Sequence, residues 1–154
     1  MRRGILVAGA VAIAAALGAA ALWRGLGEPA TRSAASPEML ALGAALYGEH
    51  CASCHGVELE GQPDWQRRLS SGRLPAPPHD ASGHTWHHAD SILFRIVRDG
   101  PAAIVGGAYE SDMPGFADLM TDAEIEAVLA FIKSTWPERE RAVQEQASIA
   151  DDPA

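Results

Sequence analysis

The sequence predicts an all-α domain. Three segments place apolar residues at helical spacing: residues 38–49, a segment from 88 or 90 to 98, and residues 121–136. No segment shows the strict alternation of apolar and polar residues that is typical of a strand, and there is no internal repeat. The length of 154 residues suits one ordinary domain with appendages. The N-terminal end is expected to add a transmembrane or signal helix to this domain.

Residues 1–24 have the features of an export signal. Arg2 and Arg3 precede an uncharged run over residues 5–23. At about 1.5 Å per residue, this run reaches about 28 Å, close to the thickness of a bilayer's hydrocarbon core. It is expected to anchor the protein on the periplasmic side of a bacterial inner membrane. The alternative is a soluble periplasmic protein, because the alanines at 19–21 suit signal cleavage.

After a flexible linker over residues 25–36, the first helix of the domain is expected. Ser36 is a suitable N-cap, and Pro37 suits the first helical position. Residues 57–90 then lack any sustained period and are rich in Gly, Pro, His and Ser. So long an irregular stretch is unusual in a compact domain, and a large buried cofactor would explain it.

Two further helices follow this loop. The first of these, from residue 88 or 90 to 98, is expected to end at Asp99, Gly100 and Pro101. An irregular segment, DMPGF, then occupies residues 112–116. Thr121 and Glu124 form a capping box for the last helix. The domain is therefore expected to span residues 37–136. Residues 137–154 are predicted to be a polar C-terminal tail, a solvated helical extension or a frayed end.

The sequence contains two cysteines, Cys51 and Cys54, in the segment HCASCHG. A disulfide between them would close too small a ring to stabilise the fold much. A zinc site would need further ligands, for which downstream histidines are available, and a redox dithiol would need a βαβ context that is absent. C-x-x-C-H is the attachment pattern of c-type haem, so Cys51 and Cys54 are predicted to form thioethers and His55 to bind the iron.

A second axial ligand is expected from the opposite side of the haem. Met113 lies in the DMPGF segment, where Pro114 and Gly115 can hold its backbone in place. Met120 is an alternative, and an unfilled or histidine-filled position is another. Met1 lies in the leader, and Met39 lies on the helix that leads to the cysteines.

These motifs together resemble a monohaem class I cytochrome c. The helix ending in CASCHG, the DMPGF loop and the helix TDAEIEAVLAFIK carry the resemblance. It implies three to four helices around one covalently bound haem, with the first and last helices crossing where Gly43 and Tyr47 meet the region of Phe131. It also implies that a proline carbonyl orients His55. Pro75 is our candidate for this role, and Pro77 is the alternative.

Several polar residues are candidates for further contacts. Arg73 and Trp86 are predicted to contact the haem propionates, which need hydrogen-bond donors when partly buried. Four histidines in the loop suggest a copper site, but their spacing matches no recognised cage, so a solvated or helix-starting role is expected. They are His79, His84, His87 and His88.

With His and Met on its iron, such a protein is expected to carry electrons rather than to act as an enzyme. The net charge of −8 argues against nucleic acid as a partner and favours redox proteins with a basic docking patch, such as a respiratory complex or oxidase. The membrane would be contacted through the N-terminal helix. The alternatives are a haem-binding sensor and a cytochrome subunit of a larger oxidase or dehydrogenase complex.

Overall fold

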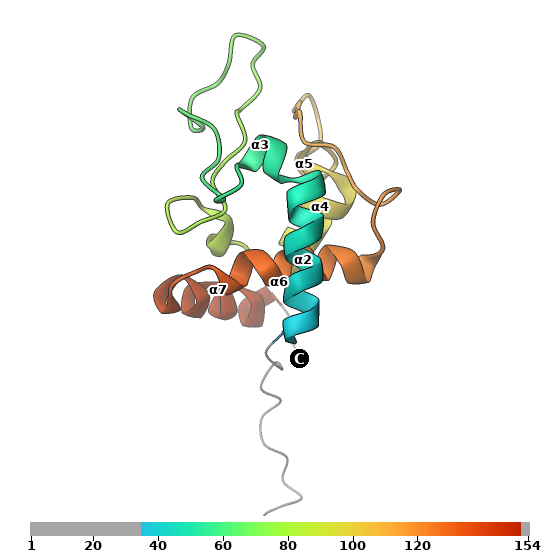
Figure 1. Cartoon of the computed structure of the whole chain (residues 1–154). Coiled ribbons are helices and arrows are strands. Elements are labelled where there is room, and N and C mark those ends of the chain that lie inside the picture. Colours follow the sequence, from blue (N-terminus) through green and yellow to red (C-terminus); the bar gives the residue numbers. More distant parts are fainter. Residues whose placement is uncertain (1–34, 152–154) are drawn as a thin grey trace, which may run out of the picture. The chain divides into compact units, whose positions relative to one another are not determined.

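The structure is a computed structural model that describes residues 35–151. The expected leader and all but the last two residues of the linker lie outside this range. The described part is helical and has no strand, which confirms the all-α prediction. No helix within it is long and apolar enough to span a bilayer. In chain order (Figure 1) the helices are α2 (Pro37–His50), α3 (Ala52–His55), the 3-10 helix η1 (Thr85–His87), α4 (Asp90–Asp99), α5 (Pro101–Val105), α6 (Asp122–Ser134) and α7 (Glu138–Asp151).

The predicted caps determine where α2 and α6 begin. The Ser36 hydroxyl accepts a hydrogen bond from the amide of Met39 at 3.2 Å, with Pro37 at the first helical position. At α6, the Thr121 hydroxyl accepts from the Glu124 amide, while the Glu124 carboxylate accepts from the Thr121 amide. Each capping pair satisfies amides that the first helical turn leaves without partners.

The first and last helices of the predicted domain cross, as the resemblance implied. A Cβ atom placed on Gly43 would clash with the carbonyl oxygen of Ala127 and lie 2.9 Å from the Cβ of Phe131. The Tyr47 ring packs against Phe131 with the ring centroids 5.5 Å apart. Figure 1 shows α2 running across α6. The missing side chain of Gly43 therefore lets the two backbones approach closely.

Gly43→Ala is expected to destabilise the protein, by about 1–3 kcal/mol in the free energy of unfolding, because the added methyl group overpacks this crossing. Gly48 lies in the same helix with no atom near the position of a Cβ. Gly48→Ala should therefore stabilise α2, by up to about 1 kcal/mol. Denaturant unfolding of both variants measures the difference. Equal effects of the two substitutions would contradict the close approach.

The hydrophobic core lies between α2, α4 and α6. The apolar faces that the helical spacing predicted supply most of it, and residues from the connecting loops close it. Its members are Tyr47, Leu59, Leu93, Val97, Phe116, Met120, Ile125, Val128, Leu129, Ile132 and Trp136.

The polar C-terminal segment is a packed part of the domain. Residues 138–151 form α7, so the helical part of the prediction holds, but the expectation of a solvated tail is wrong. Gln144 is 2% exposed and donates to the carbonyl of His88 and to the carboxylate of Asp90. The Ser148 hydroxyl accepts from the Asp90 amide at 3.0 Å. Because Ala89 has no polar side chain, Ser148 provides the cap at the start of α4.

We expect Gln144→Ala to lower the free energy of unfolding by about 1–3 kcal/mol, because it leaves the half-buried carbonyl of His88 and the carboxylate of Asp90 without this donor. Gln146 lies on the same helix and is exposed. The matched variant Gln146→Ala should therefore change stability by less than about 0.5 kcal/mol. Thermal unfolding of both variants tests the role of α7, and a neutral Gln144→Ala would argue against it.

Candidate functional site

The C-terminal end of α2 carries the cysteine pair into a single helical turn. Cys51 closes α2 through its amide, which donates to the carbonyl of Tyr47 at 2.9 Å. Its own carbonyl accepts from the amide of His55 at 2.9 Å, so α3 starts at once. Both cysteines are free thiols, with Cys51 partly buried and Cys54 exposed. This turn holds Cys51, Cys54 and His55 within one compact unit.

His55 is buried, and one of its ring nitrogens makes a hydrogen bond within the protein. The side chain is 6% exposed, and Nδ1 lies 2.8 Å from the carbonyl oxygen of Pro77. Burial lowers the pKa of His55, and the hydrogen bond to Pro77 opposes this shift only in part. Because a carbonyl only accepts, the proton must lie on Nδ1. The neutral ring then keeps a lone pair on Nε2, which is what an iron ligand requires.

The residue that orients His55 is Pro77, not Pro75. Gln62 makes two hydrogen bonds to the backbone of Ala76. Its backbone amide donates to the Ala76 carbonyl, and its side-chain oxygen accepts from the Ala76 amide, each at 2.9 Å. These two bonds fix the backbone at Ala76, and the carbonyl of the next residue, Pro77, then reaches His55. The choice of Pro75 was wrong because the contact depends on this pairing across the loop, which local sequence does not reveal.

His79, for which the sequence predicts no role at the haem site, packs against His55. The ring centroids are 4.0 Å apart, and the ring planes make an angle of 22°. Burial, together with His55 and His84 nearby, lowers the pKa of His79 to about 3, so the ring is neutral at pH 7. The only sequence signal was its position two residues after Pro77.

The other loop histidines do not gather around a common point. His84 stacks on Trp65 with centroids 5.1 Å apart, and His87 stacks on Trp86 at 3.7 Å. Across residues 35–151, no group of three or more His, Cys, Asp or Glu side chains is placed to hold a metal ion. The copper and zinc alternatives therefore gain no support from the structure.

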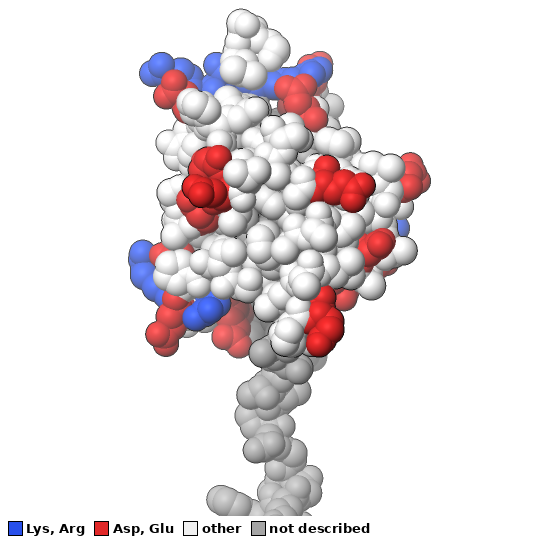
Figure 2. Space-filling view, in the orientation of Figure 1, with Lys and Arg blue, Asp and Glu red and all other residues white. Residues whose placement is uncertain are grey.

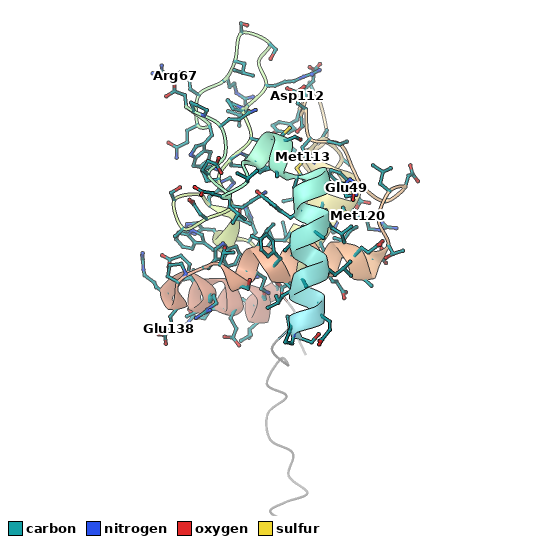
Figure 3. All side chains as sticks on the ribbon, viewed as in Figure 1. Glu49, Arg67, Asp112, Met113, Met120 and Glu138 are labelled. Atoms are coloured by element: carbon teal, nitrogen blue, oxygen red, sulfur yellow. The ribbon has the colours of Figure 1, made fainter. Side chains whose placement is uncertain are left out.

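Met113 and Met120 have different surroundings (Figure 3). Met120 belongs to the core and is 4% exposed. Met113 is partly buried in the segment between α5 and α6 and packs against the edge of the core. The chain just beyond it is fixed, since the amide of Phe116 donates to the carbonyls of Val97 and Arg98 at the end of α4, each at 3.0 Å. That Met113 binds iron stays a prediction.

Arg73 connects two loops of the site. Its guanidinium donates to the Glu110 carboxylate, with N···O distances of 3.1 Å, and to the carboxylate of Asp112. The arginine precedes Pro77 in one loop, and Asp112 precedes Met113 in the other. These exposed ion pairs add little stability individually, but they join the two loops. The predicted propionate contact of Arg73 is not tested by this arrangement.

Trp86 presents an unpaired donor. In the described part of the chain, its indole Nε1 is the one buried side-chain nitrogen or oxygen without a hydrogen-bond partner. A buried N–H group without an acceptor is costly, so an acceptor is expected at this position. The Trp86 ring packs against the core, as do Cys51 and Met113. A haem carboxylate would supply the missing acceptor.

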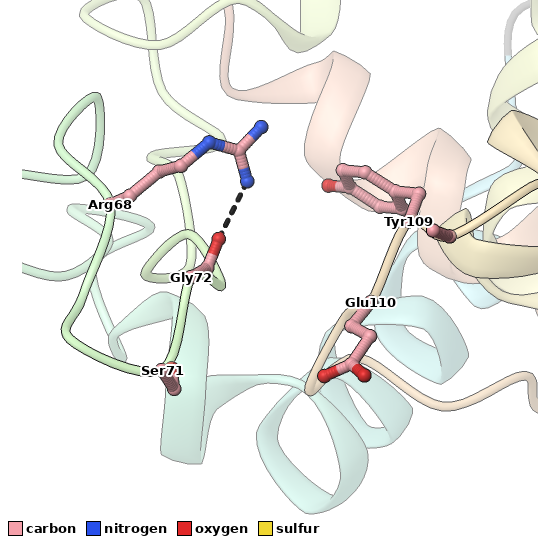
Figure 4. A pocket seen from close by; sticks show the side chains of 6 residues that line it. Arg68, Ser71, Gly72, Tyr109 and Glu110 are labelled. Atoms are coloured by element: carbon pink, nitrogen blue, oxygen red, sulfur yellow. Dashed lines mark hydrogen bonds between the residues drawn. The ribbon is translucent and has the colours of Figure 1, made fainter.

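A separate open cavity of about 320 Å³ lies between the two loops that Arg73 joins (Figure 4). Within it, the Arg68 guanidinium donates to the carbonyl of Gly72 at 2.6 Å. None of the predicted site residues lines it. The lining residues are Arg68, Ser71, Gly72, Ala108, Tyr109 and Glu110.

Comparison with known families decides the assignment. The family model described as cytochrome c matches residues 40–136. The chain belongs to the cytochrome c family. No curated protein sequence matches the chain. Members of the cytochrome c family carry covalently attached haem c and transfer electrons, and Cys51 and Cys54 fit the attachment motif.

The residues of this cytochrome fit the cofactor of its family. Two free thiols lie two residues apart, as thioether bonds to the haem require. His55 has a lone pair on Nε2, and the buried Nε1 of Trp86 lacks an acceptor. The match ends at residue 136, so α7, which caps α4, lies outside the matched region.

Proposed function

We propose that this cytochrome is an exported electron carrier with a single haem, bound by His55 and Met113 from opposite sides of the iron. The observation that carries the proposal is the state of His55. It follows Cys54 directly, it is buried and neutral, and the Pro77 carbonyl holds its Nδ1. This arrangement presents Nε2 as a ligand in both oxidation states of the iron.

The chain's residues then have distinct tasks. Haem c supplies an iron that cycles between Fe(II) and Fe(III), one electron at a time. Cys51 and Cys54 fix the cofactor covalently next to His55. A thioether from Met113 raises the reduction potential and leaves the iron no open position for a substrate. These roles favour a carrier over a catalyst.

Met113 is favoured over Met120 because of where each side chain lies. Met120 fills the core between helices, and moving it to the iron would leave a cavity there. Met113 lies at the edge of the core in a segment without regular structure, so its side chain can reach a cofactor without disturbing a helix. The anchoring of Phe116 on α4 limits how far this segment can move.

An acidic surface suits redox partners with a basic docking patch. The chain has 20 acidic against 12 basic residues. On the face shown in Figure 2, acidic side chains are scattered widely, while basic ones lie mainly at the upper and lower left edges. The attachment turn also exposes two uncharged side chains, Cys54 and Val57, which is 79% exposed. A respiratory complex or oxidase is the kind of partner this surface fits, through a small and transient interface.

We place the domain on the periplasmic side of the membrane, tethered by the N-terminal helix. Fractionation of cells that make the full chain tests this location. Recovery of the haem protein from membranes washed with high salt would support the tether. Recovery in the soluble periplasmic fraction, with the N-terminus removed, would replace it with signal cleavage.

A ferric spectrum combined with a redox titration tests the proposed function. A carrier should show the band of methionine-to-iron charge transfer and a single reversible one-electron wave. A sensor would lack the band or lose it when a gas or peroxide binds. Co-purification with a larger assembly would instead indicate a subunit of an oxidase or dehydrogenase.

Trp86→Phe is expected to lower the midpoint potential modestly, by less than an axial-ligand change would. The variant keeps the ring but removes the N–H donor, so a nearby carboxylate keeps more negative charge and stabilises Fe(III). Trp65→Phe is the control, since Trp65 packs on His84 rather than against the core. Equal potentials of the Trp86 variant and the wild type would place the acceptor elsewhere.

A further inference from the structure

His79 lies face to face with the residue that is proposed to bind iron. The two imidazole rings are stacked, with centroids 4.0 Å apart and an angle of 22° between their planes. The contact therefore places a flat ring beside His55, at van der Waals distance.

Three hydrogen bonds hold His79, two through its backbone and one through its ring. Its amide donates to the carbonyl of Leu59 at 2.8 Å, and its carbonyl accepts from the indole of Trp136 at 2.7 Å. Its ring Nδ1 lies 2.8 Å from the hydroxyl of Thr85. Thr85 and Trp136 are themselves buried, at 6% and 2% exposed. The backbone of His79 is thus fixed, and the ring cannot turn without breaking its hydrogen bond to Thr85.

The Pro77 carbonyl by itself does not fix the plane of the His55 ring. A single hydrogen bond fixes the position of Nδ1, but hydrogen-bond angles at a carbonyl are broad, so the ring can still rock around that contact. A rigid neighbour stacked on one face removes this remaining freedom. Pro77 and His79 together define both the direction and the plane of the ring.

We infer that His79 is a positioning residue, which sets the plane of the His55 imidazole relative to the haem. This inference rests on the proposed function, since it takes His55 as an iron ligand. The plane of a histidine ring that binds Fe(III) would influence how the unpaired electron is distributed over the haem. His79 would thereby control the electronic structure of the site without touching the iron.

A simple filling role makes a different prediction. Any apolar side chain of similar volume would fill the space beside His55, and it would not need a partner for Nδ1. Phenylalanine keeps a flat face without ring nitrogens, whereas leucine keeps much of the volume without the flat face. Thr85→Val keeps His79 but removes the hydroxyl that anchors its ring.

The test uses the ferric holoprotein, with paramagnetic proton NMR of the haem methyl groups and electron paramagnetic resonance as readouts. We expect His79→Leu to lose the wild-type order of the methyl resonances and to shift the g values, and Thr85→Val to shift them in part. His79→Phe keeps a flat face but loses the anchor to Thr85, so it should deviate less than His79→Leu and no more than Thr85→Val. His84→Leu is the matched control, because the His84 ring stacks on Trp65 rather than on His55, and it should keep the wild-type pattern.

Each outcome bears on the inference. A folded His79→Leu protein with the wild-type pattern would overturn it, and so would a His79→Phe protein that deviates as much as the leucine variant. If the leucine variant does not fold, Thr85→Val decides, because a wild-type pattern in that variant would overturn the inference. A wild-type protein without a low-spin histidine-ligated spectrum would overturn the proposed function as well, whereas unchanged variants of a low-spin wild type overturn the inference alone.

Discussion

Replacement of both Cys51 and Cys54 by alanine is expected to abolish covalent haem attachment completely. Each thiol forms one thioether, so the double variant has no bond that survives extraction with acidified organic solvent. Mass spectrometry should find the wild-type chain heavier by one haem and the double variant without this increase. Each single variant should keep one thioether and attach haem in lower yield.

Ser53→Ala is the control for the cysteine variants. Ser53 lies between the two cysteines and is exposed. Its replacement changes the same turn without removing a thiol, so the haem content should stay at the wild-type level. Covalent haem in the double variant would contradict the assignment of the attachment site.

Loss of the cofactor in the double variant should also lower the melting temperature strongly, because a group that binds the folded state stabilises it.

Met113→Ala is expected to remove the methionine-to-iron charge-transfer band and to lower the midpoint potential. The fall should be a sizeable part of the roughly 0.8 V range over which axial ligands set haem potentials. The covalent haem should remain, since Cys51 and Cys54 are unchanged. A ferric spectrum and a redox titration measure both effects.

Met120→Ala provides the comparison that separates a ligand from a core residue. Its side chain is 4% exposed, so truncation should leave a cavity and reduce the free energy of unfolding by about 2–5 kcal/mol. The charge-transfer band should persist in this variant. The reverse pattern, with the band lost in Met120→Ala and kept in Met113→Ala, would assign the ligand to Met120.

The helices α2, α4 and α6 were predictable because their signals are local. The caps at Ser36 and Thr121 and the apolar faces of α2, α4 and α6 follow from a few neighbouring residues. The packing of α7 was not predictable in this way. Gln144 and Ser148 look like surface residues in sequence, and their burial depends on partners about 55 residues away along the chain.

At the site, the same distinction separates what was predicted from what was missed. Cys51, Cys54 and His55 lie within one turn, so their spacing is sufficient to predict them. The orienting carbonyl belongs to Pro77 because Gln62 fixes Ala76 across the loop, and no local pattern distinguishes Pro77 from Pro75. The contact of His79 with His55 likewise depends on how the loop folds back.

The cap that Ser148 gives to α4 has a consequence for how the protein is made. The amide of Asp90 is synthesised 58 positions before the hydroxyl that it bonds. While the chain is still leaving the ribosome, the first turn of α4 lacks this partner. The cap of this helix can therefore form only after Ser148 has been synthesised and has left the ribosome.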